Sequence, residues 1–195
     1  MAQGSDSVLH GRPSGAPRWP AGLVGTALAG AAATLLLCLG LYAWLRPAGS
    51  AYLLPASLTH PIHASPMWRA VTGSVPSFAH AFALGVVTAL LLPPRRRWIW
   101  LACGAWGLVD AALELAQMPR LATTIAAALP AAFDQVPVLD HLGRYLVNGT
   151  FDAFDVMAAF AGACAAGLLL TRMLRSHERT RIAVPRDPHQ RRNEE

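Results

Sequence analysis

Five polar residues lie in or beside strongly apolar stretches of this chain: His80, Glu114, Gln117, Asp152 and Asp155. An ionisable group within a membrane costs about 2.5–3.5 kcal/mol on insertion scales, so its position points to function. An imidazole and three carboxylates can bind a ligand, carry protons, hold a metal ion or perform acid–base chemistry at an ester or phosphoester. The residue types alone do not select one of these reactions.

The composition indicates that these residues belong to a membrane protein. Of 195 residues, 54% are hydrophobic and 14% are charged, and the mean hydropathy is positive. These values predict an all-α fold of membrane-spanning helices rather than a soluble domain. All sixteen cationic residues are arginine. With the abundant alanine and leucine, this bias is typical of a high-GC bacterial genome and does not indicate a nucleic-acid-binding surface.

Four apolar stretches predict transmembrane helices at about residues 21–45, 77–93, 98–118 and 151–171. The second is marginal, because a span needs about 20 residues, and it must use its flanks or thin the bilayer locally. The first is too long for an ordinary cleavable signal and is interpreted as a retained helix. The sequence therefore predicts a four-helix transmembrane bundle with two long extracytoplasmic loops. It divides into a cytoplasmic segment, the membrane domain and a charged, mobile tail, at residues 1–20, 21–172 and 173–195.

The arginines orient this bundle. With both termini in the cytoplasm, twelve arginines lie inside and four lie outside, namely Arg46, Arg69, Arg120 and Arg144. The positive-inside rule then predicts a multi-pass protein of the bacterial inner membrane with both termini cytoplasmic. For the arginines of the tail, contact with anionic lipid is an alternative to a plain orientation signal.

In this topology the five polar residues share one depth. His80 lies about one turn below the outer start of its helix, whereas Glu114 and Gln117 lie near the outer end of the third span. Asp152 and Asp155 open the fourth span. At about 1.5 Å per residue, all five should lie just inside the outer boundary of the membrane.

Asp110 lies about one turn deeper than this ring. Asp110, Glu114 and Gln117 follow i, i+4, i+7 spacing, so they share one helix face, which must point into the bundle because lipid cannot solvate a carboxylate. We therefore expect a common pocket lined by His80, Glu114 and Asp155. Gln117 and Asp152 should lie at its mouth and Asp110 at its floor.

A purely structural role for the ring is the main alternative. Polar contacts between membrane helices contribute about 0.6 kcal/mol each on average, and neutral groups would suffice for that role. Asp152 is favoured by the dipole at its helix start. Glu114, near a helix end, instead needs a protonated His80, an arginine from the loop (Arg120 or Arg144), or its own proton.

Other features indicate packing rather than chemistry. Small residues at i, i+4, i+8 predict close-packing faces on the first and fourth spans: Gly22, Thr26 and Gly30, and Ala158, Gly162 and Ala166. The cysteines are predicted to be buried hydrophobic residues, and their spacing forms no metal-ligand motif: Cys38, Cys103 and Cys164.

The second outer loop has internal structure of its own. Residues 121–132 form an apolar run that is too short to span the membrane, which predicts an interfacial or re-entrant segment. Asn148-Gly149 predicts a turn, after which Thr150 can cap the fourth span.

The polar elements between residues 76 and 167 resemble, in their order, the VanZ-like family of small bacterial integral membrane proteins. They are His80, the arginine turn 95–97, Glu114-Leu-Ala-Gln117, Pro119-Arg120, and Asp155 followed by Gly162. The chain departs from the family in having Ala159 where Asn is frequent, no Asp-Lys ahead of His80, and a longer loop at 118–150. The resemblance implies an envelope protein, in a family named for a member associated with teicoplanin resistance, and implies no established reaction.

These observations favour an accessory, non-enzymatic membrane protein that binds an envelope lipid or glycopeptide-like ligand in an outward-facing pocket. Arg120 and Arg144 could pair there with a phosphate or carboxylate of the ligand. One alternative is an intramembrane hydrolase, metal-dependent or acid/base-dependent, that acts on an envelope lipid. Another is a small proton-coupled transporter that uses Asp110 and Glu114. Membrane lipids are the expected partners, a homo-oligomer is left open, and neither a cofactor nor a nucleic acid is expected.

Overall fold

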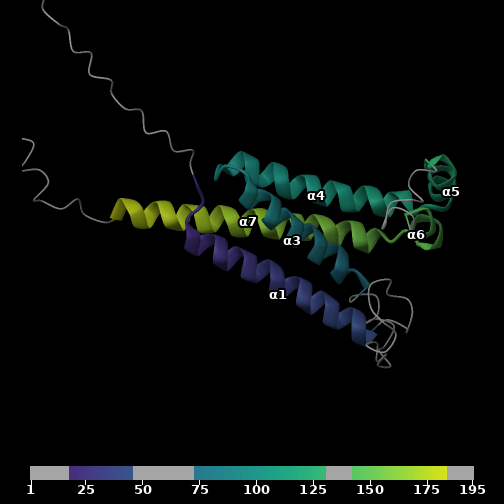
Figure 1. The fold of residues 1–195 in the computed structure, drawn as a ribbon, viewed down its shortest axis with the longest axis horizontal. Coiled ribbons are helices and arrows are strands. Elements are labelled where there is room, and N and C mark those ends of the chain that lie inside the picture. The colour runs from purple at the N-terminus through teal and green to yellow at the C-terminus, as the bar shows by residue number, and fades with distance from the viewer. Residues whose placement is uncertain (1–17, 46–72, 131–141, 184–195) are drawn as a thin grey trace, which may run out of the picture.

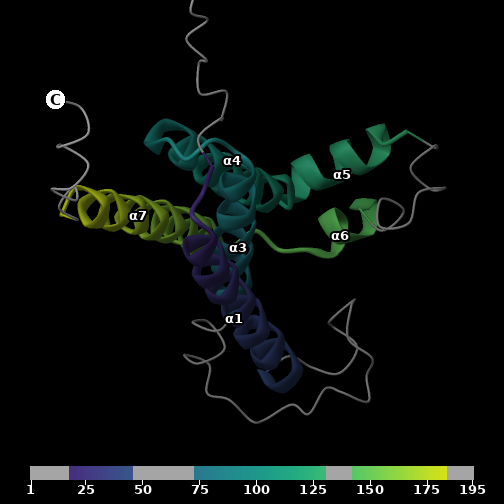
Figure 2. The same ribbon diagram turned by 60° about the vertical axis from the view of Figure 1, so that its left-hand side comes forward.

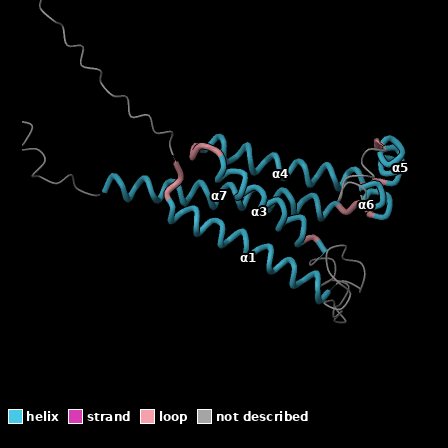
Figure 3. Tube along the Cα trace, viewed as in Figure 1, coloured by secondary structure: helices cyan, strands magenta, loops and turns pink. Residues whose placement is uncertain are grey.

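The computed structural model describes residues 18–45, 73–130 and 142–183. The helices are α1 (Ala21–Leu45), α3 (Val75–Leu91), α4 (Arg96–Ala116), α5 (Pro119–Ala128), α6 (Leu142–Asn148) and α7 (Ala153–Ala183). No strand occurs within the described residues (Figure 3), so the predicted all-α class is confirmed for this part of the chain. Arg46, Arg69 and residues 131–132 of the loops lie outside it, as do 1–17 and 184–195.

Among the described residues, three helices are long and apolar enough to cross a membrane, over Ala21–Leu41, Arg96–Ala116 and Ala153–Thr180. α3 is apolar but shorter, at 17 residues. Large side chains point outward from these helices, for example Leu36, Leu108 and Phe154, which are 67%, 63% and 63% exposed. The interior is small: twelve of the nineteen buried apolar residues among those described are alanine. Small residues inside and large apolar residues outside are typical of helices packed in lipid.

The helices pack as a three-helix core with a fourth helix at its side. α3, α4 and α7 contact one another, whereas α1 packs along α3 and scarcely touches α7, as Figures 1 and 2 show. The predicted four-helix bundle is therefore not closed in the described residues. One reason is that α1 offers mainly Ala27 and Ala31 to its neighbours, while its leucines point away from the core.

The two ends of the core differ, and we name them for their residues. At the arginine end lie the start of α1, the turn between α3 and α4, and the last turns of α7 (Figure 1). The indole Nε1 of Trp19, just before α1, donates a hydrogen bond of 2.9 Å to the backbone carbonyl of Leu92, the residue that follows α3. The acidic end holds the end of α4 and the start of α7, with α5 and α6 beyond them (Figure 1).

Glycines bring the core helices into close contact. A Cβ atom on Gly162 of α7 would overlap the backbone carbonyl of Phe78 in α3, and Gly107 of α4 meets Ala163 of α7. The predicted small face of α7 is therefore a packing face. The predicted face of α1 is not, since Gly22 and Gly30 have open space around them.

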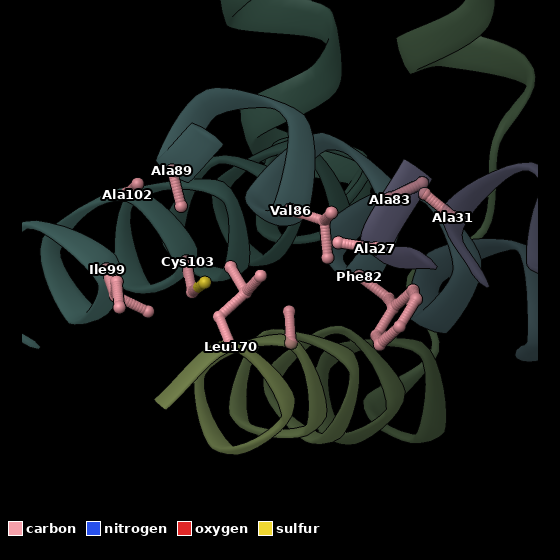
Figure 4. Close-up of a cluster of buried hydrophobic side chains, with 11 residues drawn as sticks. Ala27, Ala31, Phe82, Ala83, Val86, Ala89, Ile99, Ala102, Cys103 and Leu170 are labelled. Atoms are coloured by element: carbon pink, nitrogen blue, oxygen red, sulfur yellow. The ribbon is translucent and has the colours of Figure 1, made fainter. Parts of the chain in front are cut away.

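One hydrophobic cluster joins all four helices of the core region. Figure 4 shows Ala27 and Ala31 from α1 meeting Phe82 and Val86 of α3, with Ile99 and Cys103 of α4 and Leu170 of α7 completing it. Cys38 is also buried, whereas Cys164 is exposed, so the prediction of three buried cysteines is wrong for Cys164.

The segments around the core differ in part from expectation. The apolar run predicted at 121–132 contains α5, which packs against α6. The two lie crosswise beyond the end of α4 (Figures 1 and 2), an arrangement that favours the interfacial interpretation. The prediction of a mobile tail from residue 173 is wrong as far as residue 183, because α7 continues to Ala183. No glycine or proline interrupts residues 172–183, which are rich in helix-forming residues.

Candidate functional site

The end of α4 carries three of the predicted residues on one face. Glu114 and Gln117 are 8% and 6% exposed, and Asp110 is half-buried. The helix ends here because Met118 precedes Pro119 and takes an extended backbone conformation, as residues before proline prefer. The i, i+4, i+7 spacing therefore places these side chains against the core, as the sequence predicts.

The start of α7 contributes Asp152 and Asp155. Asp152 lies just before the helix, and its Oδ1 accepts a hydrogen bond of 2.8 Å from the Phe154 backbone N–H. This is the geometry of an N-cap, so the cap is Asp152 rather than the predicted Thr150. Thr150 lies three residues before the first helical residue, outside the position from which a cap can act. Asp155 lies in the first turn, where the helix dipole favours a carboxylate.

The Glu114 carboxylate lies at the junction of α4 and α7. Its Oε1 accepts a hydrogen bond of 3.3 Å from Gln117 Nε2. It also interacts with the backbone N–H of Asp152 and, electrostatically, with the carboxylate of Asp155. Its Oε2 is buried without a hydrogen-bond partner among the described residues. The structure thus brings together four of the five residues predicted at the end of α4 and the start of α7: Glu114, Gln117, Asp152 and Asp155.

Gln117 connects this cluster to α6. Its Nε2 donates a second hydrogen bond, of 3.0 Å, to the hydroxyl of Tyr145. A Cβ atom on Gly149 would overlap the Gln117 carboxamide, so glycine at that position gives the amide room against the backbone. Tyr145 and Gly149 were not predicted as site residues. The Asn148-Gly149 turn was the available signal, because it marks a close backbone approach as well as a change of direction.

His80 and Asp110 form a separate pair. His80 is exposed on α3, and it interacts electrostatically with Asp110 of α4. Oδ2 of Asp110 is buried without a hydrogen-bond partner in the described part of the chain. The described contacts join His80 to Asp110 and do not join it to Glu114 or Asp155. That His80 lines one pocket with those two residues stays a prediction.

The two arginines predicted to assist the site lie on α5 and α6. Arg120 is exposed in the first turn of α5. Arg144 belongs to α6, but its side chain lies outside what the structure describes. The donor set at the acidic end consists of carboxylate oxygens, an amide and a phenol. Within the described residues, no group of three or more His, Cys, Asp or Glu side chains has the arrangement to hold a metal ion.

Comparisons with known proteins give no further assignment. No family model, no curated protein and no solved structure matches the chain. The proposed function therefore rests on the geometry at the acidic end.

Proposed function

We propose that the chain is a VanZ-like protein that crosses the bacterial inner membrane four times with both termini in the cytoplasm. Three helices have sufficient length and apolarity, and the apolar α3 lies between α1 and the remaining core helices. The exposed arginines of the α3–α4 turn and of α7 lie at the same end as the start of α1 (Figure 1). The positive-inside rule assigns that end to the cytoplasm.

The proposed activity is binding of an envelope lipid or glycopeptide-like ligand at the acidic end. The observation that supports it is the buried Glu114, whose Oε2 has no described hydrogen-bond partner and which lies close to Asp155. A buried polar atom of this kind is costly unless something satisfies it. Two neighbouring carboxylates attract hydrogen-bond donors, so the ligand group that enters should be an ammonium or a set of hydroxyls. Ethanolamine headgroups and amino sugars of glycopeptides offer such groups.

Ligand retention tests this activity. The full chain is placed in phosphatidylcholine nanodiscs, and binding of a fluorescent glycopeptide or of added phosphatidylethanolamine is measured by fluorescence and native mass spectrometry. Glu114→Gln and Asp155→Asn should each weaken retention about tenfold, as expected for loss of one charge-assisted hydrogen bond. Glu178→Gln is the matched control, because Glu178 is an exposed carboxylate at the arginine end. Unchanged retention in both acidic-end variants would contradict the proposal.

A second candidate function is acid/base hydrolysis of an envelope lipid. It is favoured by the electrostatic interaction of His80 with Asp110, since an imidazole near a carboxylate can act as a general base. A fluorescent-headgroup phospholipid is the substrate for its test. Release of the headgroup by the wild type and its loss in His80→Gln would support hydrolysis, whereas no release by the wild type would exclude it for that lipid class.

A further inference from the structure

The arginine end carries a dense positive surface that the proposed ligand site does not use. Seven exposed arginines lie there, on the approach to α1, at the start of α4 and on α7: Arg18, Arg95, Arg96, Arg97, Arg172, Arg175 and Arg179. We call this set the arginine collar. Among the described residues, its end of the molecule holds a single carboxylate, Glu178. The charge of the collar is therefore not neutralised within the described protein.

The three segments of the collar lie at one level because the core packing sets their register. The ring of Trp100, in the second turn of α4, lies against Gly167 of α7. Ile99 of α4 belongs to the same cluster as Leu170, and Met173 packs against that cluster. The first turn of α4 is therefore level with the arginines that begin at residue 172. The bond from Trp19 to the Leu92 carbonyl brings the start of α1 to the same level.

Aromatic side chains mark this level as a membrane interface. Trp19, Trp98 and Trp100 all lie near the arginine end, and the guanidinium of Arg97 lies 5.3 Å from the centre of the Trp98 ring. Indole rings concentrate at the headgroup level of bilayers. Arginines at that level reach lipid phosphates, and the guanidinium fork matches the oxygens of a phosphate group.

We propose that the arginine collar binds the headgroups of anionic phospholipids. The collar joins exposed guanidinium groups from three segments to a set of interfacial tryptophans, and among the described residues of that end only Glu178 offsets their charge. An orientation signal needs these charges only during insertion, whereas lipid binding requires the same guanidinium groups to contact headgroups in the inserted protein.

Tryptophan quenching tests this proposal on the full chain. Nanodiscs are made with brominated phosphatidylglycerol or brominated phosphatidylcholine, and quenching of tryptophan fluorescence gives the relative affinity for the two lipids. Both leaflets have the same composition, so an altered topology does not affect the result. The wild type should prefer phosphatidylglycerol. Arg96→Gln, Arg97→Gln and Arg172→Gln should each reduce that preference about fivefold, the value that corresponds to about 1 kcal/mol per interfacial arginine.

Arg120→Gln is the matched control, because Arg120 is exposed at the opposite end, and it should leave the preference unchanged. Equal quenching of the wild type by the two lipids would overturn the proposal and leave the collar as an orientation signal. Loss of the preference on adding inorganic phosphate at constant ionic strength would also overturn it, because the site would then be one for a free anion.

Discussion

The acidic end and the arginine end of the core differ in where their charged groups lie, because one buries a carboxylate and the other exposes its guanidinium groups. At the acidic end, Glu114 is buried and its carboxylate contacts Gln117 and the start of α7. At the arginine end, the guanidinium groups of Arg95, Arg96 and Arg97 are all exposed. The acidic end therefore depends on how the helices are assembled. At the arginine end, the charges interact mainly with what surrounds the protein.

α4 runs from one end to the other, and its charged residues are placed unfavourably with respect to its helix dipole. The positive end of its dipole lies beside Arg96 and Arg97, and its negative end lies near Asp110 and Glu114. Each such charge is disfavoured by about 0.3–1 kcal/mol relative to the reverse order. The N-terminus of α7 and the Gln117 amide offset this at the acidic end. Changes at that end should consequently cost more stability than changes at the other, and the following variants test the difference.

The largest effect is expected from Gly162→Ala. The added methyl would overlap the backbone carbonyl of Phe78, and neither helix can yield as a flexible side chain would, so the free energy of unfolding should fall by about 3 kcal/mol. Gly104→Ala is the control, because Gly104 has open space around it in the same core and alanine favours a helix by about 1 kcal/mol. Unfolding in detergent measures both. Equal effects would show that α3 and α7 are not in close contact.

Glu114→Ala should lower the free energy of unfolding by about 2 kcal/mol, since it removes the acceptor for Gln117 and leaves that buried amide with one partner fewer. Glu114→Gln keeps the shape and an acceptor oxygen, so its loss should stay below about 1 kcal/mol. Comparing the two variants separates the role of the hydrogen bond from that of the negative charge. Equal losses in the two variants would mean that the negative charge, which both of them remove, stabilises the cluster.

Asp152→Ala should destabilise the protein by about 1 kcal/mol, the usual value of an N-cap side chain, because the Phe154 N–H loses its acceptor. Thr150→Ala should have almost no effect. Thermal unfolding of both variants compares the two candidate caps directly, and a larger effect at Thr150 would reverse the assignment.

Arg96→Gln should change the free energy of unfolding by less than about 0.5 kcal/mol, as expected at an exposed position. The same variant should still reduce the preference for phosphatidylglycerol, so that stability and lipid binding separate at this end. Hydrogen exchange of the α4 amides would report any local loosening. A loss as large as that of Glu114→Ala would remove the distinction between the two ends.

The sequence predicted the parts of this arrangement that depend on local pattern. The apolar stretches locate α1, α3, α4 and the first part of α7 to within about two residues at their starts, and the 110–114–117 spacing identifies the buried face of α4. The side of α3 on which His80 lies could not be predicted, because a short apolar helix has no polar face to show which side meets its neighbours. Periodicity cannot then distinguish an inward position from an outward one.

Tyr145 was missed for a different reason. α6 has only seven residues, too few to be stable alone or to show an apolar period, so its existence depends on packing against α5. The bond from Gln117 to Tyr145 is likewise a long-range contact between segments 28 residues apart. Spacing along the chain carries no signal for a contact of that kind.

The position of α7 in the chain also has a consequence for biosynthesis. α7 is the last of the described helices to leave the ribosome, yet it supplies the backbone N–H and the packing surface that Glu114 uses. Until α7 inserts, a nascent chain that ends after α4 exposes Asp110 and Glu114 to lipid without these partners, which is a costly state. Insertion of α7 removes that cost. The free energy of these carboxylates in the membrane therefore differs between an unfinished chain and a finished one.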